Sequence, residues 1–239
     1  MSKEVMIILL SLSISIIGTV IGTLLGIMGK KISSRSIGKA LSFSGGIMLI
    51  LTFFELIPGA IDRSGIDFFM IFFSIGIVFI LMIDYFSSFY KKNSKFKKAI
   101  MIMLGLMLHN FPEGLVMGIG FIEGSSIGMK MSILIAIHDL PEGIAIAAPL
   151  LYTNTSKRKI VLSSIITSIP AVLGTILAIV LKSISPAVMS ISLSIAAGIM
   201  SYTVLFEIIP ESREMIGFKD NMVFLTLGSI IAILMIRFI

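Results

Sequence analysis

The 239-residue sequence contains no cysteine and few charged residues. Without cysteine, the chain cannot form disulfides, thiolate zinc sites or cysteine-ligated iron–sulfur clusters. Charged residues make up 13% of the chain, whereas 56% of it is hydrophobic and the mean hydropathy is +1.10. A soluble domain of this size needs more polar cover than such a composition provides. The sequence therefore predicts an integral membrane protein with the lipid bilayer as its surroundings.

Two functional motifs are also missing. The sequence has no G-x-x-x-x-G-K-[ST] loop, so ATP-driven pumping by this chain is not expected. It has no H-E-x-x-H motif, the signature of many metalloproteases. The net charge of +6 comes from short basic clusters between apolar runs, so we expect the membrane, and not a nucleic acid, to be their partner.

Long apolar runs separated by charged or turn-forming residues predict an all-α protein with about eight transmembrane helices. Each run has room for the roughly 20 residues that cross the hydrocarbon core. Together they form a single transmembrane domain over residues 1–239. The predicted spans are 5–29, 36–58, 67–89, 99–120, 127–151, 159–181, 187–209 and 221–238.

The basic residues predict an orientation for these spans. The loops after the odd-numbered spans, which all lie on one side, hold 14 of the 19 Lys and Arg residues. The positive-inside rule places these loops in the cytoplasm. With an even number of spans, both termini are then expected outside, in a multi-pass protein of the plasma (inner) membrane.

An internal repeat relates the two ends of the chain. The letters GIM at 46–48 precede FELIP at 54–58, and GIM at 198–200 precedes FEIIP at 206–210, with an offset of 152 residues. The same offset aligns spans 1–3 with spans 6–8, and spans 1 and 6 cross in opposite directions. The sequence thus predicts a 3+2+3 arrangement, in which an inverted repeat surrounds spans 4 and 5. Inverted repeats around a midplane site are a recurring transporter plan.

The two central spans contain a second pair of related motifs. HNFPEG at 109–114 and HDLPEG at 138–143 lie 29 residues apart and include the two histidines of the chain. Ionisable groups at the centre of a bilayer cost about 2.5–3.5 kcal/mol each on insertion scales, so they should face one another and a ligand. At about 100° per residue, the first, second and fifth residues of each motif share one helix face.

Imidazole and carboxylate groups in this arrangement suit zinc, iron(II), manganese or cadmium. Pro112 and Pro141 also free the carbonyls of Leu108 and Ile137, which membranes tolerate only where they are buried in protein or line a wet cavity. The predicted metal-binding residues are His109, Asn110, Glu113, His138, Asp139 and Glu142.

The two motifs resemble the signature of the ZIP (Zrt/Irt-like) metal transporters, bacterial branch, and the resemblance extends over the whole chain. It implies a first metal position made by His109, Glu113, His138 and Glu142. It implies a second position made by Asn110 and Asp139, with both glutamates shared. In some relatives a glutamate of span 6 completes the second position; Ala171 stands there, so this position is expected to be incomplete. The resemblance further implies metal uptake into the cytoplasm, no resident cofactor and a homodimer.

The resemblance also implies acidic residues along the transport path. Asp84 and Glu207 match positions near the cytoplasmic exit, with Glu211 just beyond, and the repeat places Glu55 at the external end of span 2. Two alternatives to transport stay open. A metal-dependent membrane enzyme would need an open metal position and a general base. A metal-gated sensor would bind metal without carrying it across the membrane.

Overall fold

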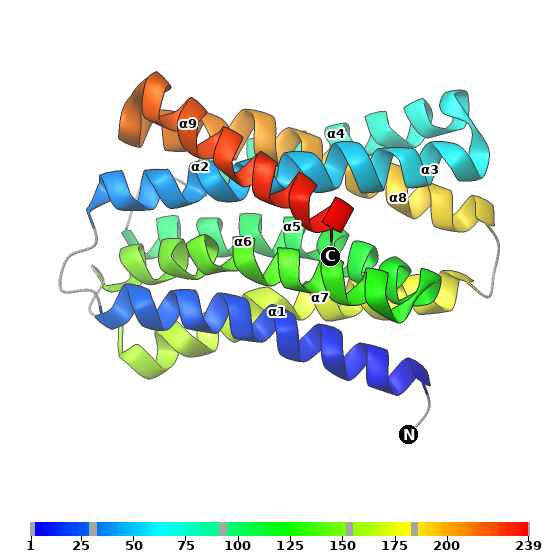
Figure 1. The fold of residues 1–239 in the computed structure, drawn as a ribbon. Helices are drawn as coiled ribbons and strands as arrows, with labels where there is room; N and C mark the ends of the chain where they lie inside the picture. Colours follow the sequence, from blue (N-terminus) through cyan, green and yellow to red (C-terminus); the bar gives the residue numbers. More distant parts are fainter. Residues whose placement is uncertain (1–2, 29–32, 91–94, 152–154, 183–185, 239) are drawn as a thin grey trace.

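The structure, a computed structural model, describes residues 3–28, 33–90, 95–151, 155–182 and 186–238. Every element within these ranges is helical. The α-helices are α1 (Lys3–Met28), α2 (Ser34–Leu51), α3 (Ile57–Ser64), α4 (Ile66–Tyr90), α5 (Lys95–Glu123), α6 (Ser125–Leu151), α7 (Lys157–Lys182), α8 (Pro186–Tyr202) and α9 (Ile209–Phe238) (Figure 1).

These helices overlap the predicted spans and fit an integral membrane protein. Within the described ranges, four segments are long and apolar enough to cross a membrane by length and composition: Ser34–Ser64, Ile66–Ile83, Lys157–Leu181 and Ala187–Arg237. Two spans extend further than the sequence predicted, because helical structure continues past residue 58 to Ser64 and past residue 209 to the α9 kink at Gly217.

Two short π-helical turns interrupt long helical segments. The turn η1 (Thr52–Leu56) joins α2 to α3, and η2 (Thr203–Ile208) joins α8 to α9. Each lies directly before an Ile-Pro pair that contains Pro58 or Pro210. A proline cannot donate to the carbonyl four residues back and its ring crowds that carbonyl, so the preceding turn widens. Accordingly, the N–H of Ile57 bonds the Thr52 carbonyl, five residues back.

Two glycines with positive φ make the sharp turns that follow. Gly65 (φ 83°) separates α3 from α4, and Gly217 (φ 80°) kinks α9. This region of backbone conformation suits glycine because it has no Cβ. The two glycines lie 152 residues apart, the offset of the sequence repeat.

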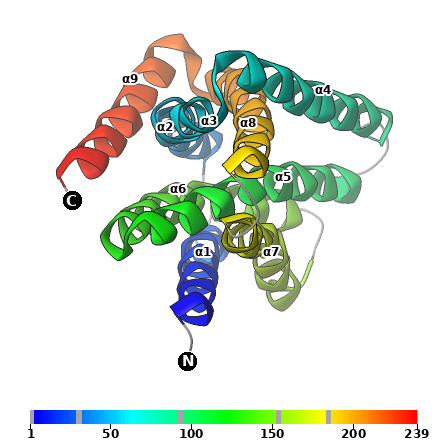
Figure 2. The ribbon, with the colours of Figure 1, turned by 90° about the vertical axis from the view of Figure 1, so that its right-hand side faces the viewer.

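The helices form two groups, which Figures 1 and 2 show from the side and from one end. One group contains α1, α5, α6 and α7, with α1 packed along α6 and α5 packed along α7. The other contains α2, α3, α4, α8 and α9, with α2 packed along α9 and α4 along α8. The largest apolar core lies where the groups meet, and includes Met48, Leu115, Ile135 and Met200.

Paired glycines allow the closest approach at each of these four main contacts. An ideal Cβ on any of the eight would lie only 1.8–2.3 Å from a backbone carbonyl oxygen of the facing helix. Small residues are the usual means by which membrane helices approach this closely. The pairs are Gly22 with Gly143 (α1 and α6), Gly114 with Gly174 (α5 and α7), Gly46 with Gly228 (α2 and α9), and Gly76 with Gly198 (α4 and α8).

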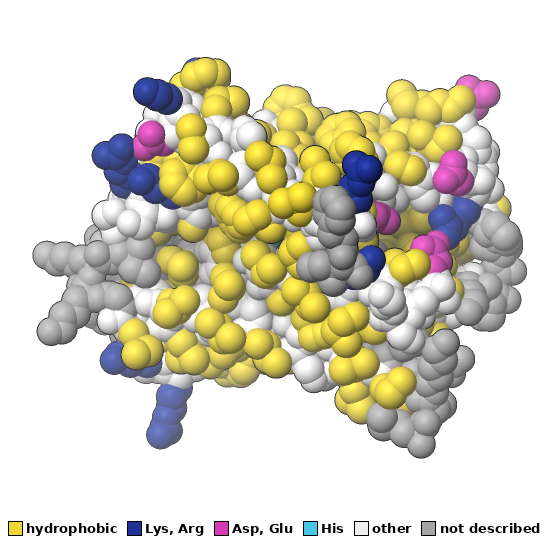
Figure 3. All heavy atoms as spheres, in the orientation of Figure 1, with side chains coloured by type: hydrophobic (Ala, Val, Ile, Leu, Met, Phe, Trp, Pro, Cys, Tyr) yellow, Lys and Arg dark blue, Asp and Glu magenta, His cyan; other side chains and the backbone are white. Residues whose placement is uncertain are grey.

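Large apolar side chains cover much of the outer surface. Examples are Ile71, 59% exposed, and Phe206, 65% exposed. Figure 3 shows a largely apolar face with most of its basic side chains at the left end and its acidic side chains mainly toward the right. This distribution fits helices that present apolar flanks to lipid and basic ends to the membrane interface.

Candidate metal site

Helices α5 and α6 form the hairpin that positions both motifs. Gly124 alone connects them, and its N–H bonds the Gly120 carbonyl while its own carbonyl accepts from the Gly128 N–H. The two helices are therefore antiparallel neighbours, as predicted for spans 4 and 5.

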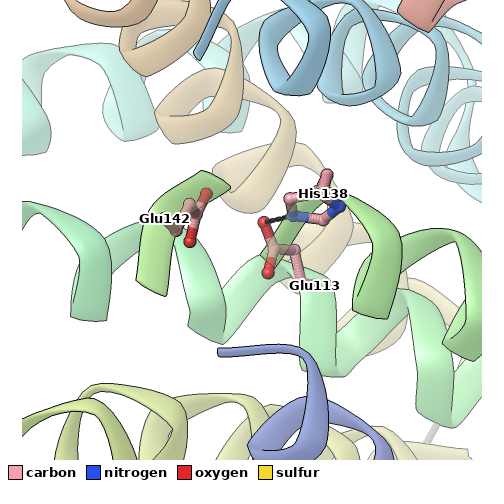
Figure 4. A group of neighbouring side chains, drawn as sticks. All are labelled: Glu113, His138 and Glu142. Carbon is pink, nitrogen blue, oxygen red and sulfur yellow. Dashed lines mark hydrogen bonds and ion pairs between the residues drawn. The ribbon is translucent and has the colours of Figure 1, made fainter. Parts of the chain in front are cut away.

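Three predicted side chains meet between these helices. Glu113 comes from α5, and His138 and Glu142 lie one turn apart on α6 (Figure 4). Each offers a ligand atom, and these atoms all lie within 4.8 Å of one another. The side chains are at most 2% exposed, and His138 Nε2 lies 2.8 Å from Glu113 Oε1. The proline and glycine of each motif directly flank its glutamate in the sequence, and both helices continue as α-helix through them.

The spacing suits a small dication after a modest contraction. Zinc bonds to nitrogen and oxygen ligands measure about 2.0–2.2 Å, so a tetrahedral site spaces its ligand atoms by roughly 3.3–3.6 Å. Ligand atoms 4.8 Å apart would have to approach each other by roughly 1.2–1.5 Å to reach this spacing. The Glu113–His138 pair, at 2.8 Å, would instead have to separate by roughly 0.5–0.8 Å.

Two further predicted residues adjoin the cluster. Asp139 is fully buried, and its Oδ1 lies 3.4 Å from His138 Nε2. Asn110 is 1% exposed, and its side-chain amide donates to the Thr167 carbonyl of α7 at 2.7 Å. The Asn110 Oδ1 and the His138 Nδ1 have no hydrogen-bond partner in the described part of the chain. Buried polar atoms of this kind usually have a partner in protein, water or an ion.

The charges of the site favour a cation. Three carboxylates, from Glu113, Asp139 and Glu142, surround one imidazole, and all four groups are buried. Burying a carboxylate costs far more than burying an amide unless a cation or a proton compensates it. A divalent ion bound to these oxygens would offset that cost.

Hydroxyl groups from neighbouring helices hold the backbone of both motifs. Thr23 of α1 donates to the Gly143 carbonyl, Ser44 of α2 to the His138 carbonyl, and Thr175 of α7 to the Gly114 carbonyl. Sequence reasoning missed them, because serine and threonine on apolar helices usually bond their own helix one turn back. Their place next to the motifs depends on which helices pack together.

Several predictions lie beyond what the structure describes. His109 is in α5 and Asp84 in α4, but both side chains are outside the described part. Ala171 is fully buried on α7, at the close crossing with Gly114. A glutamate at position 171 would therefore lie opposite Gly114, the residue that follows Glu113.

The predicted path residues Glu55 and Glu207 both lie in π-helical turns. Glu55, in η1, is partly buried and lines a cavity of about 230 Å³. Glu207, in η2, is also partly buried, while Glu211 is exposed in the first turn of α9. π-Helical turns are frequent at functional sites. Val116, three residues along α5 from Glu113, lines the same cavity as Glu55.

The cavity also contains charges that the sequence analysis did not single out. Arg63 of α3 lies 3.0 Å from Glu123 at the end of α5, and it donates to the Gly59 carbonyl at 2.6 Å. Asp62 lines the same space. Arg63 and Glu123 are 60 residues apart, and no local pattern in the sequence connects them.

Comparison with known proteins identifies relatives for most of the chain. Residues 92–236 match the ZIP zinc transporter family. The chain is 32% identical over 215 residues to the zinc transporter ZupT of Enterobacter sp. (strain 638), covering 82% of each protein. It is 31% identical to the ZupT protein of Salmonella paratyphi A and 30% identical to that of Salmonella heidelberg (strain SL476), with the same coverage.

Proposed function

Because the chain belongs to the ZIP zinc transporter family, bacterial branch, we propose that it takes up zinc into the cytoplasm through the buried site between α5 and α6. A protein of this family transports divalent metal and is not an enzyme. Zinc is the metal in the names of its relatives, and iron(II), manganese or cadmium are further cargoes that the mixed nitrogen and oxygen ligands would accept.

The observation that carries this proposal is the buried Glu113–His138–Glu142 cluster. Its three ligand-bearing side chains come from two helices and lie within 4.8 Å of one another. Groups of this kind are rare within membrane helices unless they serve an ion path or pair with one another. We propose that His109 completes the first metal position and that Asn110 and Asp139 contribute to an incomplete second one.

The proposed architecture is eight spans in a 3+2+3 arrangement with an inverted repeat. Three kinds of position support it, because each recurs at or near the 152-residue offset: the π-helical turns, the positive-φ glycines and the crossing glycines. Adding 152 to the residue number relates Gly22 to Gly174, Gly46 to Gly198 and Gly76 to Gly228. The two remaining crossing glycines, Gly114 and Gly143, are the equivalent residues of the two central motifs.

Such symmetry suits alternating access, in which the two halves exchange roles as the site faces one side and then the other. We propose that the end with the cavity around Glu55 is extracytoplasmic, and that Asp84, Glu207 and Glu211 line the cytoplasmic exit. Both termini are then outside an inner membrane. We further propose a homodimer.

The test is zinc uptake into proteoliposomes that contain the purified protein. A His109→Ala/His138→Ala double variant should lose uptake, because the imidazoles supply the nitrogen ligands of the site. Glu113→Ala should have the same effect. The matched control is Ser132→Ala, since Ser132 is also fully buried on α6 but, within the described residues, bonds only the Gly128 carbonyl one turn back. Its uptake should equal that of the wild type.

Each result has a defined meaning. Uptake that persists in both site variants would refute the site assignment. Tight zinc binding by the wild type without uptake would instead support a metal-gated sensor. Loss of uptake in Ser132→Ala as well would mean that the variants fail through folding and not through lost ligands.

A further inference from the structure

An apolar groove lies on the outside of the bundle, between the end of α1 and the start of α7. It measures about 550 Å³ and is open to the surroundings of the protein. The floor and walls are hydrophobic, and several of these side chains are well exposed, among them Met28 at 76% and Leu162 at 55%. The hydrophobic lining residues are Leu24, Ile27, Met28, Val161, Leu162 and Ile165.

Two adjacent cations, Lys157 and Arg158, line the mouth of this groove. Both are exposed, and no acidic side chain in the described ranges lies within ion-pair distance of either. The first turn of α7 contains no acidic residue that would repel an anion. The groove therefore combines an apolar channel with a positive charge that the described chain leaves uncompensated.

The groove also has the right position relative to the bilayer. Lys157 begins α7 and Met28 ends α1, so the basic mouth lies at helix ends while the apolar lining runs inward along both helices. This order, charge at the interface and hydrocarbon below it, is that of a phospholipid. Basic pockets between membrane helices bind anionic head groups in this way.

We propose that this groove binds one anionic phospholipid, with its phosphate at Lys157 and Arg158 and an acyl chain along α1 and α7. The lipid would connect the two helices that flank the metal-site hairpin, since α1 packs on α6 and α7 packs on α5. Bound there, it stabilises the folded bundle by mass action. This site is separate from the metal cluster and does not depend on transport.

The test is lipid binding to the full chain in a neutral detergent. Native mass spectrometry would measure the dissociation constant of the first phosphatidylglycerol, with phosphatidylcholine of the same acyl chains as comparison. The wild type should retain phosphatidylglycerol much more strongly. In Lys157→Gln/Arg158→Gln the first dissociation constant should rise roughly 30-fold, because each cation near an anionic surface contributes about a fivefold effect.

A second double variant, Arg213→Gln/Lys219→Gln, removes the same charge from the same end of the bundle without touching the groove. Its phosphatidylglycerol affinity should stay within about twofold of the wild type, because its cations stack on Phe218 or lie beside Asp220. Leu162→Trp tests the apolar part, since it fills the channel and leaves both cations in place; it should weaken phosphatidylglycerol binding.

Three outcomes would overturn the proposal. Equal retention of phosphatidylcholine and phosphatidylglycerol would mean that charge plays no part. Equal losses of phosphatidylglycerol affinity in the two double variants would mean that the affinity depends on the net charge of the protein and not on this groove. A dimer that Leu162→Trp dissociates, seen by light scattering, would mean that a second copy of the chain covers this groove.

Discussion

At the scale of single residues, the closest contact in the proposed metal site is also an obstacle to metal binding. His138 Nε2 and Glu113 Oε1 lie 2.8 Å apart and share a hydrogen between them. His138 Nε2 cannot direct its lone pair at a metal while that hydrogen lies between the two atoms. A cation that takes both atoms as ligands must therefore move this hydrogen, either to His138 Nδ1, which has no hydrogen-bond partner in the described part of the chain, or to solvent.

Zinc binding should thus release one proton per ion if the hydrogen goes to solvent, and none if it moves to His138 Nδ1. Calorimetric titration in buffers of different ionisation enthalpy would measure this number directly. Affinity should also fall as the pH is lowered, because protons compete for the same atoms. In Glu113→Gln, which removes one of the acidic groups that compete with zinc for protons, the dependence of affinity on pH should weaken. A zinc affinity that does not change with pH in the wild type would contradict simultaneous ligation by Glu113 and His138.

Ala171 gives a second prediction at this scale. Ala171→Glu would place a carboxylate at the α5–α7 crossing beside Glu113, and it should raise zinc stoichiometry from one to two per chain. Elemental analysis of the purified protein after zinc loading and desalting would measure it. Ala171 is fully buried, so Ala171→Gln is the control for added bulk. Two zinc ions in the glutamine variant, or one in the glutamate variant, would argue against the predicted second position.

At the scale of helices, four close crossings hold the fold together. Each crossing has one glycine on each helix, and each glycine lies against a backbone carbonyl of the other helix. Lipid surrounds these helices, and association in such surroundings depends on van der Waals contact more than on the hydrophobic effect. A single methyl group at a crossing therefore disturbs the contact along the whole pair.

Gly114→Ala should destabilise the protein, because its Cβ would lie 1.8 Å from the Ala171 carbonyl oxygen. Overpacking of a close contact costs roughly 1–3 kcal/mol, and this atom is backbone that cannot rotate away. Gly124→Ala is the control, since its nearest neighbour would be 3.9 Å away. Thermal unfolding in detergent should show a lowered midpoint for Gly114→Ala only. Equal midpoints for the two variants would mean that the crossing tolerates a wider spacing.

At the scale of the whole molecule, polar contacts between the two helix groups are informative. Ser44 of α2 donates to the His138 carbonyl of α6, and Arg63 of α3 pairs with Glu123 of α5. Any movement of the metal-site group past the other group would have to break such contacts. The Arg63–Glu123 pair also borders the cavity next to the site.

Arg63→Gln should shift the conformational balance away from the state with this cavity. The chain has no cysteine, so Ile119→Cys, in the cavity wall, would be a unique reporter. When Arg63→Gln is added to this reporter, labelling of the cysteine by a membrane-impermeant maleimide should slow by up to about fivefold, because partly exposed ion pairs contribute about 0–1 kcal/mol. The charge swap Arg63→Glu/Glu123→Arg should restore the labelling rate.

The matched control is Arg35→Gln, which breaks the Arg35–Asp220 pair of 2.7 Å within one helix group. It should leave the labelling rate unchanged. If Arg35→Gln slows labelling as much as Arg63→Gln does, the effect does not arise from contact between the groups.

Many of the helices could be predicted from the sequence, because a lipid environment strongly constrains the length and polarity of the segments that cross it. The length of apolar runs predicted the helices, and the cost of burying His138, Asp139 and Glu142 in a membrane predicted that they lie together with Glu113. These residues do meet, all buried, between α5 and α6. The repeat was visible because local features such as Ile-Pro pairs and glycines act on their own segment of backbone.

Only the tertiary structure decided which segments face one another. It brings Arg63 to Glu123 and Gly114 to Gly174, and it joins Leu24 to Lys157 in one groove. These contacts depend on how helices far apart in the sequence pack. The side chains of an apolar helix do not indicate which other helix packs against it. The sequence by itself determined what this protein must bury, and packing decided how the buried groups are held and what remains exposed to lipid.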